Sequence, residues 1–445
     1  MKFYENFIFL SFLLLPISLI TGPLIVDITA STGALFIILH SLFISKNFTI
    51  FKNKYFILIL IYLAYLIISS LLSEYKWHSL ETSIIYFRFI FFLIALIFII
   101  EKYLNFLNYF CTICLLVLFV VTTDALFQYF YGFNILGYEF RSQNLQDRLS
   151  GLFGDEKILG NFIIKIYPLF FATLIFNSFI KNNNIKFVIF TIITFLSLFV
   201  IILSGERTSI FYFCLFIIYS SLFVRWERKK RFIVLLLVSI SILIMSIKNE
   251  HFQTRIEATL HSNHGIFGEE GLRFFSPTHH IYYTTAFKMF KDNIISGIGP
   301  KNYRNYCKKP EYNISLLQKY KISEIITQKE IDDGSVYLKY PNEKFDDNTS
   351  CTTHPHHFHL QILAETGIFG YILFLIFFCI LLKEFIFNII KYRDDVYFIV
   401  IFPVLQTMSI ITPSANVFNN YFSIVLYLLI GFFIISYRRI HLKNK

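Results

Sequence analysis

KFVIFTIITFLSLFVIILSGERTSIFYFCLFIIYSSLFVRWERKKR, residues 186–231, contains two apolar runs with a short polar break between them and a basic segment behind them. The runs cover 187–204 and 209–224. Each is about as long as a helix must be to cross the roughly 30 Å hydrocarbon core of a bilayer. The stretch therefore predicts two consecutive membrane-spanning helices, with their charged loops in water.

The rest of the chain repeats this pattern. Its 445 residues are 56% hydrophobic and 19% aromatic, and its mean hydropathy is +0.61. Multi-span membrane proteins have such a composition, whereas soluble globular proteins are less apolar. We expect an all-α, polytopic integral membrane protein with about twelve transmembrane helices. The predicted spans are 8–26, 28–45, 55–73, 83–100, 108–127, 158–178, 187–204, 209–224, 232–247, 368–383, 395–412 and 421–437.

Basic residues are concentrated in alternate loops of this arrangement. With twelve spans, these loops and both termini fall on one side of the membrane, and their excess of Lys and Arg identifies that side as the cytoplasm. The net charge of +11 then follows from topology, so membrane lipids are expected as surroundings and no nucleic-acid partner is expected. The basic segments are 46–54, 181–186, 225–231, 383–395 and 438–445.

Two loops on the opposite side are long, namely 128–157 and 248–367. The second loop divides the chain into a membrane domain with spans 1–9, residues 1–247, and a membrane segment with spans 10–12, residues 368–445. Loops of this length inside a compact protein usually carry function. We therefore expect the chemistry in the outer loop between the ninth and tenth spans.

The outer loop begins with a recognisable helix and also holds two cysteines. In SPTHHIYYTTAFKMFKDNIISGIGPKNY, residues 276–303, apolar side chains recur at helical spacing as far as Phe290, and Gly297 then breaks the pattern. This predicts a helix followed by a turn. Cys307 and Cys351 lie in an environment that is oxidising outside the cytoplasm, so both a disulfide and two free thiols remain open.

Four histidines end the outer loop, in THPHHFHLQILAETGIFGY, residues 353–371. Pro355 fits the first turn of a helix, where its missing N–H costs nothing. Such a helix would place His356 and His359 on one face and would stop at Gly367. Its N-terminus would suit an anion such as a phosphate.

The histidines allow three interpretations. A zinc site needs ligands that converge as a tetrahedron, whereas a helix would turn His357 away from its neighbours. A single histidine, His356, would instead serve as a general base, because an ordinary pKa of about 6.5 suits proton transfer near neutral pH. In the third interpretation the histidines are polar interface residues. The zinc interpretation would draw its ligands from His354, His356, His357, His359, His279 and His280.

Several charged residues lie near the outer ends of the predicted spans, where burial is costly and function is the usual explanation. Arg88, Asp124, Lys165 and Arg207 belong to spans or their borders, and Arg148 lies in the other long loop. One interpretation is structural, with Arg88 paired to Asp124. In the other, the guanidinium groups gather at the outer face and bind a lipid-linked phosphate or pyrophosphate, because the planar fork of Arg binds phosphate through two nitrogens.

HHFHLQILAETGIFGY resembles the signature of the O-antigen ligase and polymerase superfamily. That signature has a His, a small polar residue, nine further positions and then Gly-x-x-Gly followed by Gly, Thr or Tyr. Here His356 takes the His position, Gly367 and Gly370 are the motif glycines, and Tyr371 takes the last place. His357 departs from the pattern, since the family usually has Asn, Ser or Gln there.

Three further stretches are similar to patterns of this family. SGERTSI supplies an arginine after the seventh span, Arg207, and RLSGLFGDEKILGN supplies an outer-loop arginine, Arg148. AFKMFKDNIISGIGPKNY resembles the helix-and-glycine segment at the start of the long loop. Arg273 is a weaker match to a loop arginine. We expect pyrophosphate or substrate binding by Arg148, Arg88, Arg273, His357 and Lys165.

The resemblance implies a fold like that of GT-C glycosyltransferases and an activity at the periplasmic face of a bacterial inner membrane. A glycan would pass from undecaprenyl pyrophosphate to a hydroxyl of lipid A core, with no metal ion and no cofactor. His356 would be the general base, and Arg207 would act on the charge of the leaving group. Direct displacement would invert the anomeric centre.

Two other functions stay open. A polymerase of the same superfamily would use the same donor but would pass the growing chain to a lipid-linked repeat. A lipid-linked glycan flippase or transporter would also have about twelve spans, yet it would be expected to carry charges at mid-membrane and related halves. The single dominant late loop and the His-to-Gly signature favour the ligase.

Overall fold

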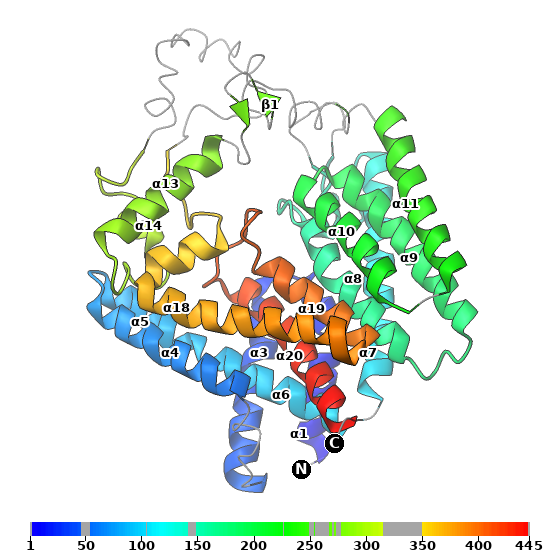
Figure 1. Ribbon diagram of the computed structural model, residues 1–445, viewed down its shortest axis with the longest axis horizontal. Helices are drawn as coiled ribbons and strands as arrows, with labels where there is room; N and C mark the ends of the chain where they lie inside the picture. Colours follow the sequence, from blue (N-terminus) through cyan, green and yellow to red (C-terminus); the bar gives the residue numbers. More distant parts are fainter. Residues whose placement is uncertain are drawn as a thin grey trace.

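The computed structural model describes residues 2–45, 54–103, 105–140, 148–225, 227–248, 253, 267–268, 271–272, 277–314 and 349–443. These residues are almost entirely helical, apart from two short paired strands, which confirms the predicted all-α fold (Figure 1). The main helices are α1 (Lys2–Leu13), α2 (Leu15–Ser18), α3 (Pro23–Leu39), α4 (Lys54–Leu72), α5 (Lys76–Tyr86), α6 (Arg88–Lys102), α7 (Phe106–Tyr131), α8 (Leu159–Phe176), α9 (Asn183–Ser204), α10 (Arg207–Phe223), α11 (Arg228–Lys248), α13 (Pro277–Asp292), α14 (Tyr303–Tyr306), α18 (Phe358–Phe387), α19 (Asp395–Thr407) and α20 (Asn420–Lys443). The strands are β1 (Phe267–Gly268) and β2 (Gly271–Leu272), and short 3-10 and π segments are η1 (His40–Ser45), η3 (Gly151–Phe153) and η5 (Asn388–Tyr392).

Within the described residues, eight helices are long and apolar enough to cross a membrane, and α10 and α19 are shorter apolar helices. The chain is therefore a multi-pass membrane protein. The predicted boundary between the first two spans is wrong. The helical path breaks at 19–22 and restarts at Pro23, because proline lacks an N–H and suits the first turn of a helix. The preceding Gly22 has a φ of 106°, which favours glycine.

The helices are arranged around a buried centre. α6 packs against α3 and α20, and α19 packs against both α8 and α20. Figure 1 shows α8 to α11 grouped on one side and α4 and α5 on the other, with α18 running across between them. α1 and the last turns of α20 lie at one end of the molecule, and α13 lies toward the other.

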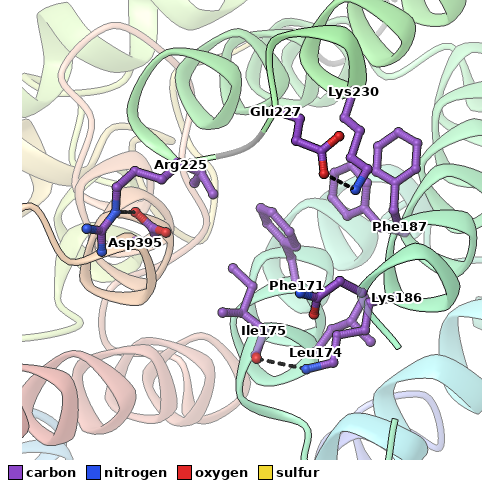
Figure 2. Close-up of a pocket in the computed structure, with 12 residues that line it drawn as sticks. Phe171, Leu174, Ile175, Lys186, Phe187, Arg225, Glu227, Lys230 and Asp395 are labelled. Atoms are coloured by element: carbon purple, nitrogen blue, oxygen red, sulfur yellow. Dashed lines mark hydrogen bonds and ion pairs between the residues drawn. The ribbon is translucent and has the colours of Figure 1, made fainter. Parts of the chain in front are cut away.

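A cavity of about 250 Å³ opens where α8 and α10 end and where α9, α11 and α19 begin (Figure 2). Aromatic side chains form part of its wall, and charged groups lie around them. The cations have partners: Arg225 is 3.2 Å from Asp395 and Lys230 is 2.8 Å from Glu227, while Lys186 donates to a backbone carbonyl. The cavity lies at the ends of these helices opposite to Arg207.

The predicted helix stop at Gly367 is a kink inside α18. Gly367 has φ 66° and ψ −169°, and the helix continues beyond it. Two carbonyls that the kink frees find new donors in the turn after α13. The amide of Ile298 donates to the carbonyl of Ala364 over 3.0 Å, and that of Gly299 donates to the carbonyl of Glu365 over 2.9 Å. The break is thus satisfied by backbone pairing, as a buried polar group requires.

The close approach at the kink explains both motif glycines. A Cβ at Gly367 would meet the carbonyl oxygen of Ile295 and would lie 2.6 Å from the amide nitrogen of Gly297. A Cβ at Gly297, where φ is 67°, would lie 2.5 Å from backbone atoms of α18. At Gly370 a Cβ would meet the side chain of Thr366 and would lie 2.8 Å from Tyr65. No larger residue fits these positions without a shift of the backbone or of neighbouring side chains.

A polar stripe on one face of α4 fastens the same turn. Tyr65 and Ser69 are four residues apart, and Ser73 follows four residues later, so the three share one side of the helix and its C-terminal extension. Tyr65 donates to the carbonyl of Thr366 over 2.8 Å. Ser69 and Ser73 donate to carbonyls of the turn, at residues 296 and 298, over 2.7 and 2.6 Å. α4 therefore binds the turn and the kink together.

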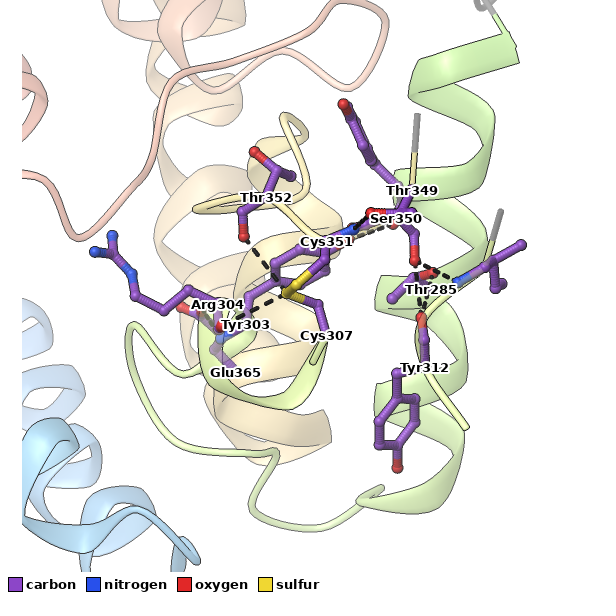
Figure 3. Close-up of a disulfide and its surroundings, with 12 residues drawn as sticks. Thr285, Tyr303, Arg304, Cys307, Tyr312, Thr349, Ser350, Cys351, Thr352 and Glu365 are labelled. Carbon is purple, nitrogen blue, oxygen red and sulfur yellow. Dashed lines mark hydrogen bonds between the residues drawn. A yellow bond between two sulfur atoms is a disulfide. The ribbon is translucent and has the colours of Figure 1, made fainter. Parts of the chain in front are cut away.

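Cys307 and Cys351 form a disulfide (Figure 3), which decides between the two states that the sequence left open. The bond joins the end of α14 to the segment that leads into the histidines. Beside it, the hydroxyl of Tyr303 donates to the carbonyl of Ser350 over 2.9 Å. The predicted helix and turn of 276–303 are confirmed by α13 and by the positive φ of Gly297.

Candidate active site

His356 lies in front of α18 and is not part of it. α18 begins at Phe358, and the side chain of His357 caps it by accepting a hydrogen bond from the amide of Leu360 over 3.2 Å. The backbone of His356 has a φ of 53°, a left-handed conformation that ends regular structure. The predictions that Pro355 starts a helix and that His356 shares a face with His359 are therefore wrong. The helix begins after the cap formed by the His357 side chain, not at Pro355.

The ring of His356 lies in the middle of a row of three histidines. Its centroid is 4.0 Å from that of His354 and 5.9 Å from that of His279, which α13 contributes. The ring of Tyr282 stacks on it at 5.5 Å. We refer to His354, His356 and His279 as the histidine row. The row is assembled from two segments that are more than seventy positions apart in the chain.

The backbone of His356 is fixed from two sides. Its carbonyl accepts a hydrogen bond from the amide of Ser414 over 2.9 Å and another from the hydroxyl of Tyr283 over 3.4 Å. Ser414 lies in the loop after α19, and Tyr283 lies on α13. These partners hold the main chain in its left-handed conformation and leave the imidazole itself unengaged.

His356 differs from the other clustered histidines in the state of its ring. In the part of the chain that the structure describes, no hydrogen bond engages either ring nitrogen of His356, and the residue is half-buried. The neighbouring rings have partners that hold their nitrogens in place. These partners are Thr353 and the Ser414 carbonyl for His354, the Leu360 amide for His357, and Tyr371 and the Met408 carbonyl for His359.

Burial keeps these imidazoles neutral. It lowers the pKa of His356 from 6.5 to about 4, and it lowers the pKa of His357 to about 4 as well. Burial and the charge of His356 lower the pKa of His354 to about 3. Burial, the charge of His356 and the charge of Arg207, in this order, lower the pKa of His279 to about 4. At neutral pH the lone pair of His356 is free to accept a proton.

Arg207 lies toward the His279 end of the histidine row, and Arg148 lies within electrostatic reach of Arg207. Arg207 is the exposed first residue of α10, and its charge acts on His279. Its neighbour Glu206 is buried and accepts hydrogen bonds from the amides of Gly160, over 2.7 Å, and the following residue, over 2.9 Å. Burial raises the pKa of Glu206, and these hydrogen bonds, one from the hydroxyl of Ser209 and the charge of Arg148 partly offset this effect. The structure thus brings Arg207 within electrostatic reach of both Arg148 and His279.

Other predicted site residues have partners of their own. Arg88 pairs with Asp27 at 2.5 Å, so the suggested pair of Arg88 with Asp124 is wrong. Asp124 instead accepts a hydrogen bond from the amide of Ile135 over 3.0 Å. Lys165 is buried and donates to the hydroxyl of Thr407. Arg273 lies outside the described residues.

Glu365 has a structural role. Its buried carboxylate accepts hydrogen bonds from the amides of Lys301 and Tyr303 over 2.9 and 3.0 Å and from the side chain of Gln361 over 3.2 Å. These bonds tie α18 to α14 and to the turn before it. Gln361 also donates to the side chain of Asn416 over 2.8 Å, so it contributes to the same network.

Sequence reasoning missed the residues that support His356. Tyr282 and Tyr283 follow His279 by three and four positions on α13, so helical spacing would have placed them on its face. Ser414 carries no such signal, because its contact with His356 arises between elements far apart in the chain. Among the described residues, no group of three His, Cys, Asp or Glu side chains could hold a metal ion. The zinc interpretation therefore finds no ligand set there.

Residues 192–375 match a family model described as O-antigen ligase. No curated protein and no solved structure matches the chain. The matched region runs from α9 into α18 and includes Arg207, His356, Gly367 and Gly370, while Arg148 precedes it. Residues 192–375 of this multi-pass membrane protein are therefore similar to the O-antigen ligase family.

Proposed function

We propose that the protein is an O-antigen ligase-type glycosyltransferase. It moves a glycan from undecaprenyl pyrophosphate to a hydroxyl of lipid A core at the periplasmic face of the inner membrane, without a metal ion. One observation carries the proposal: the ring of His356 has no hydrogen-bond partner among the described residues and is held in a row whose His279 end lies within electrostatic reach of Arg207.

The arginines act on the donor. A sugar pyrophosphate is a good leaving group once its charge is neutralised, so the protein need not protonate it. Arg207 is exposed at the start of α10, and Arg148 lies within electrostatic reach of the same helix start. Fixed guanidinium groups stabilise the charge that develops on the leaving pyrophosphate, and they need no rearrangement during the reaction.

His356 acts on the acceptor. Its neutral imidazole takes the proton of the attacking hydroxyl while the new bond forms between that oxygen and the anomeric carbon. The bond between the anomeric carbon and the phosphate oxygen breaks, and its electron pair leaves with undecaprenyl pyrophosphate. The proton then passes from His356 to solvent. Displacement from the opposite side inverts the anomeric centre.

The test is the surface glycan profile of a strain that lacks this protein, with carrier-linked and lipid A-linked glycans resolved. A ligase is supported by polymer that accumulates on the carrier together with bare lipid A core. Single repeats on the core would instead indicate the polymerase. Normal chains in normal places would contradict both activities and would point to transport or to another acceptor.

A further inference from the structure

Arg304 is a cation that the proposed reaction does not yet use. It lies on α14, whose position is fixed by the disulfide at Cys307 and by the hydrogen bond from the Tyr303 amide to Glu365. The side chain is half-buried, and its Nε is buried without a hydrogen-bond partner. Figure 3 shows it extending from α14 on the side away from Thr285.

Two more buried polar atoms without partners lie in the same neighbourhood. They are Nε2 of His78, near the start of α5, and Oγ of Ser414. The charge of Arg304 acts on both His78 and His354, and Nε2 of His354 lies 3.3 Å from the carbonyl oxygen of Ser414. Buried polar atoms normally have partners, so the unpartnered Nε of Arg304 and these two further atoms indicate a place for a polar ligand.

Two acids share this neighbourhood. Glu81, three residues after His78 on α5, acts on His78 and on Lys301, and Glu365 is engaged by backbone amides. The charge of Arg304 reaches Glu365, but no ion pair joins the two side chains. The carboxylate instead accepts hydrogen bonds from the amides of Lys301 and Tyr303. Within the described residues, no carboxylate lies within ion-pair distance of Arg304. Its guanidinium group can therefore still donate hydrogen bonds to an oxyanion of a bound ligand.

Arg304 and Arg207 lie at opposite ends of the histidine row. Arg304 acts on His354, and Arg207 acts on His279, while His356 lies between these two rings at 4.0 and 5.9 Å. In a direct displacement the nucleophile approaches from the side opposite to the leaving group. When the pyrophosphate lies at the Arg207 end, the acceptor hydroxyl must therefore arrive from the Arg304 end.

We infer that Arg304, with His78 and Ser414 beside it, forms an acceptor subsite that binds an anionic group of the acceptor glycan, a phosphate or a carboxylate. This inference rests on the proposed function. A guanidinium group is suited to both oxyanions because it donates two parallel hydrogen bonds. The subsite orients the acceptor so that its hydroxyl meets His356, and it selects acceptors that carry negative charge near that hydroxyl.

The experiment uses the full-length protein in lipid nanodiscs with an undecaprenyl-pyrophosphate-linked glycan as donor. Three acceptor preparations are compared: lipid A core as extracted, the same material after phosphatase, and the same material with its carboxyl groups amidated. Arg304→Gln should raise the KM for the untreated acceptor about 10- to 100-fold, as loss of a charged hydrogen bond implies. The KM for the donor should stay within about twofold, a change well below that loss.

The treated acceptors identify the oxyanion. Removal of the recognised group should raise the KM of the wild-type protein by a similar factor and should leave the Arg304→Gln variant unaffected. Arg304→Lys should recover part of the loss, since it keeps the charge but not the planar fork. Arg225→Gln is the matched control, because this arginine lies beside the cavity at the other end of the helices, and both KM values should stay unchanged.

The outcomes separate the inference from the proposed function. An unchanged acceptor KM in Arg304→Gln, with normal transfer, would overturn the subsite and leave the ligase activity intact. A raised donor KM would overturn it as well, since Arg304 would then belong to the donor. No transfer by the wild-type protein would overturn both. If Arg304→Gln lowers the thermal unfolding midpoint, Arg304→Lys replaces it as the test variant. The acceptor KM of Arg304→Lys is then measured with all three acceptors. Values equal to those of the wild type for all three would contradict the inference.

Discussion

His356 combines two properties that its neighbours lack together. Its backbone is locked by Ser414 and Tyr283, whereas its ring has no hydrogen-bond partner among the described residues. A general base needs both, because it must be positioned before the substrate arrives and must then receive a proton. His357 and His359 instead use their rings to cap or to brace α18, although they lie in the same short motif.

The low pKa of His356 predicts the acid limb of the activity. Burial lowers that pKa from 6.5 to about 4. The base is therefore deprotonated across the neutral range, and kcat/KM should stay level below pH 6.5 and fall only as the pH approaches 4. A pH profile of transfer with purified protein measures this. An acid limb centred at or above pH 6.5 would contradict a buried His356 as the base.

The same shift has a stability consequence. His279, His354, His356 and His357 have lower pKa values in the folded protein than in the unfolded chain, where the ordinary value is 6.5. Below that pH the unfolded chain binds protons that the folded protein excludes. The free energy of unfolding should therefore fall as the pH drops from 6.5 toward 4. Thermal unfolding in detergent at several pH values measures the slope, and His354→Gln should reduce it.

At the scale of elements, the kinked α18 and the turn after α13 form one unit. Their backbones approach too closely for a side chain at Gly297 or Gly367, and α4 fastens both through its polar stripe. The His-to-Gly signature thus describes two things. The histidine carries the proposed chemistry, and the glycines let the helix that follows it bend around the turn.

Gly367→Ala should destabilise this unit more than strain alone does. A positive φ costs a non-glycine residue about 1–3 kcal/mol, and here the new Cβ would also meet the carbonyl oxygen of Ile295. Gly137→Ala is the matched control, because φ is 85° there and no atom lies within 4 Å of the added Cβ. The thermal unfolding midpoint should drop further for Gly367→Ala. Equal drops for the two variants would show that the close approach contributes nothing.

The disulfide between Cys307 and Cys351 also holds elements together near the site. It fastens α14, and with it Arg304, to the segment that leads into His356. Removal of a native disulfide typically costs about 2–4 kcal/mol of unfolding free energy. A reductant should therefore lower both the unfolding midpoint and the transfer rate of the wild-type protein.

The Cys307→Ser and Cys351→Ser double variant serves as the control, since the remaining cysteines are free thiols. It should be less stable from the outset and should not respond to the reductant. A response in this variant equal to that of the wild type would show that the reductant acts elsewhere.

At the scale of the molecule, the sequence predicts the spans well and the site only in part. Apolar runs such as 187–204 and 55–73 are read correctly because bilayer thickness imposes a local rule on them. The predicted boundary between the first two spans is misplaced, because the observed break at 19–22 depends on one glycine and one proline. The histidine row and the disulfide needed the fold, since each joins segments that are separated in the chain. The resemblance predicts roles for His356 and Arg207, but it does not point to Arg304 or to the stripe on α4.

The most direct measurement is transfer by purified full-length protein with His356→Gln beside the wild type. The donor is an undecaprenyl-pyrophosphate-linked glycan, the acceptor is lipid A core, and the product linkage is determined by NMR. The wild type should release undecaprenyl pyrophosphate and form an inverted linkage. The variant should be slower by roughly 10²–10⁴-fold, the usual contribution of a general base, with donor binding retained. A variant that transfers at the wild-type rate, or a product with retained configuration, would contradict the account.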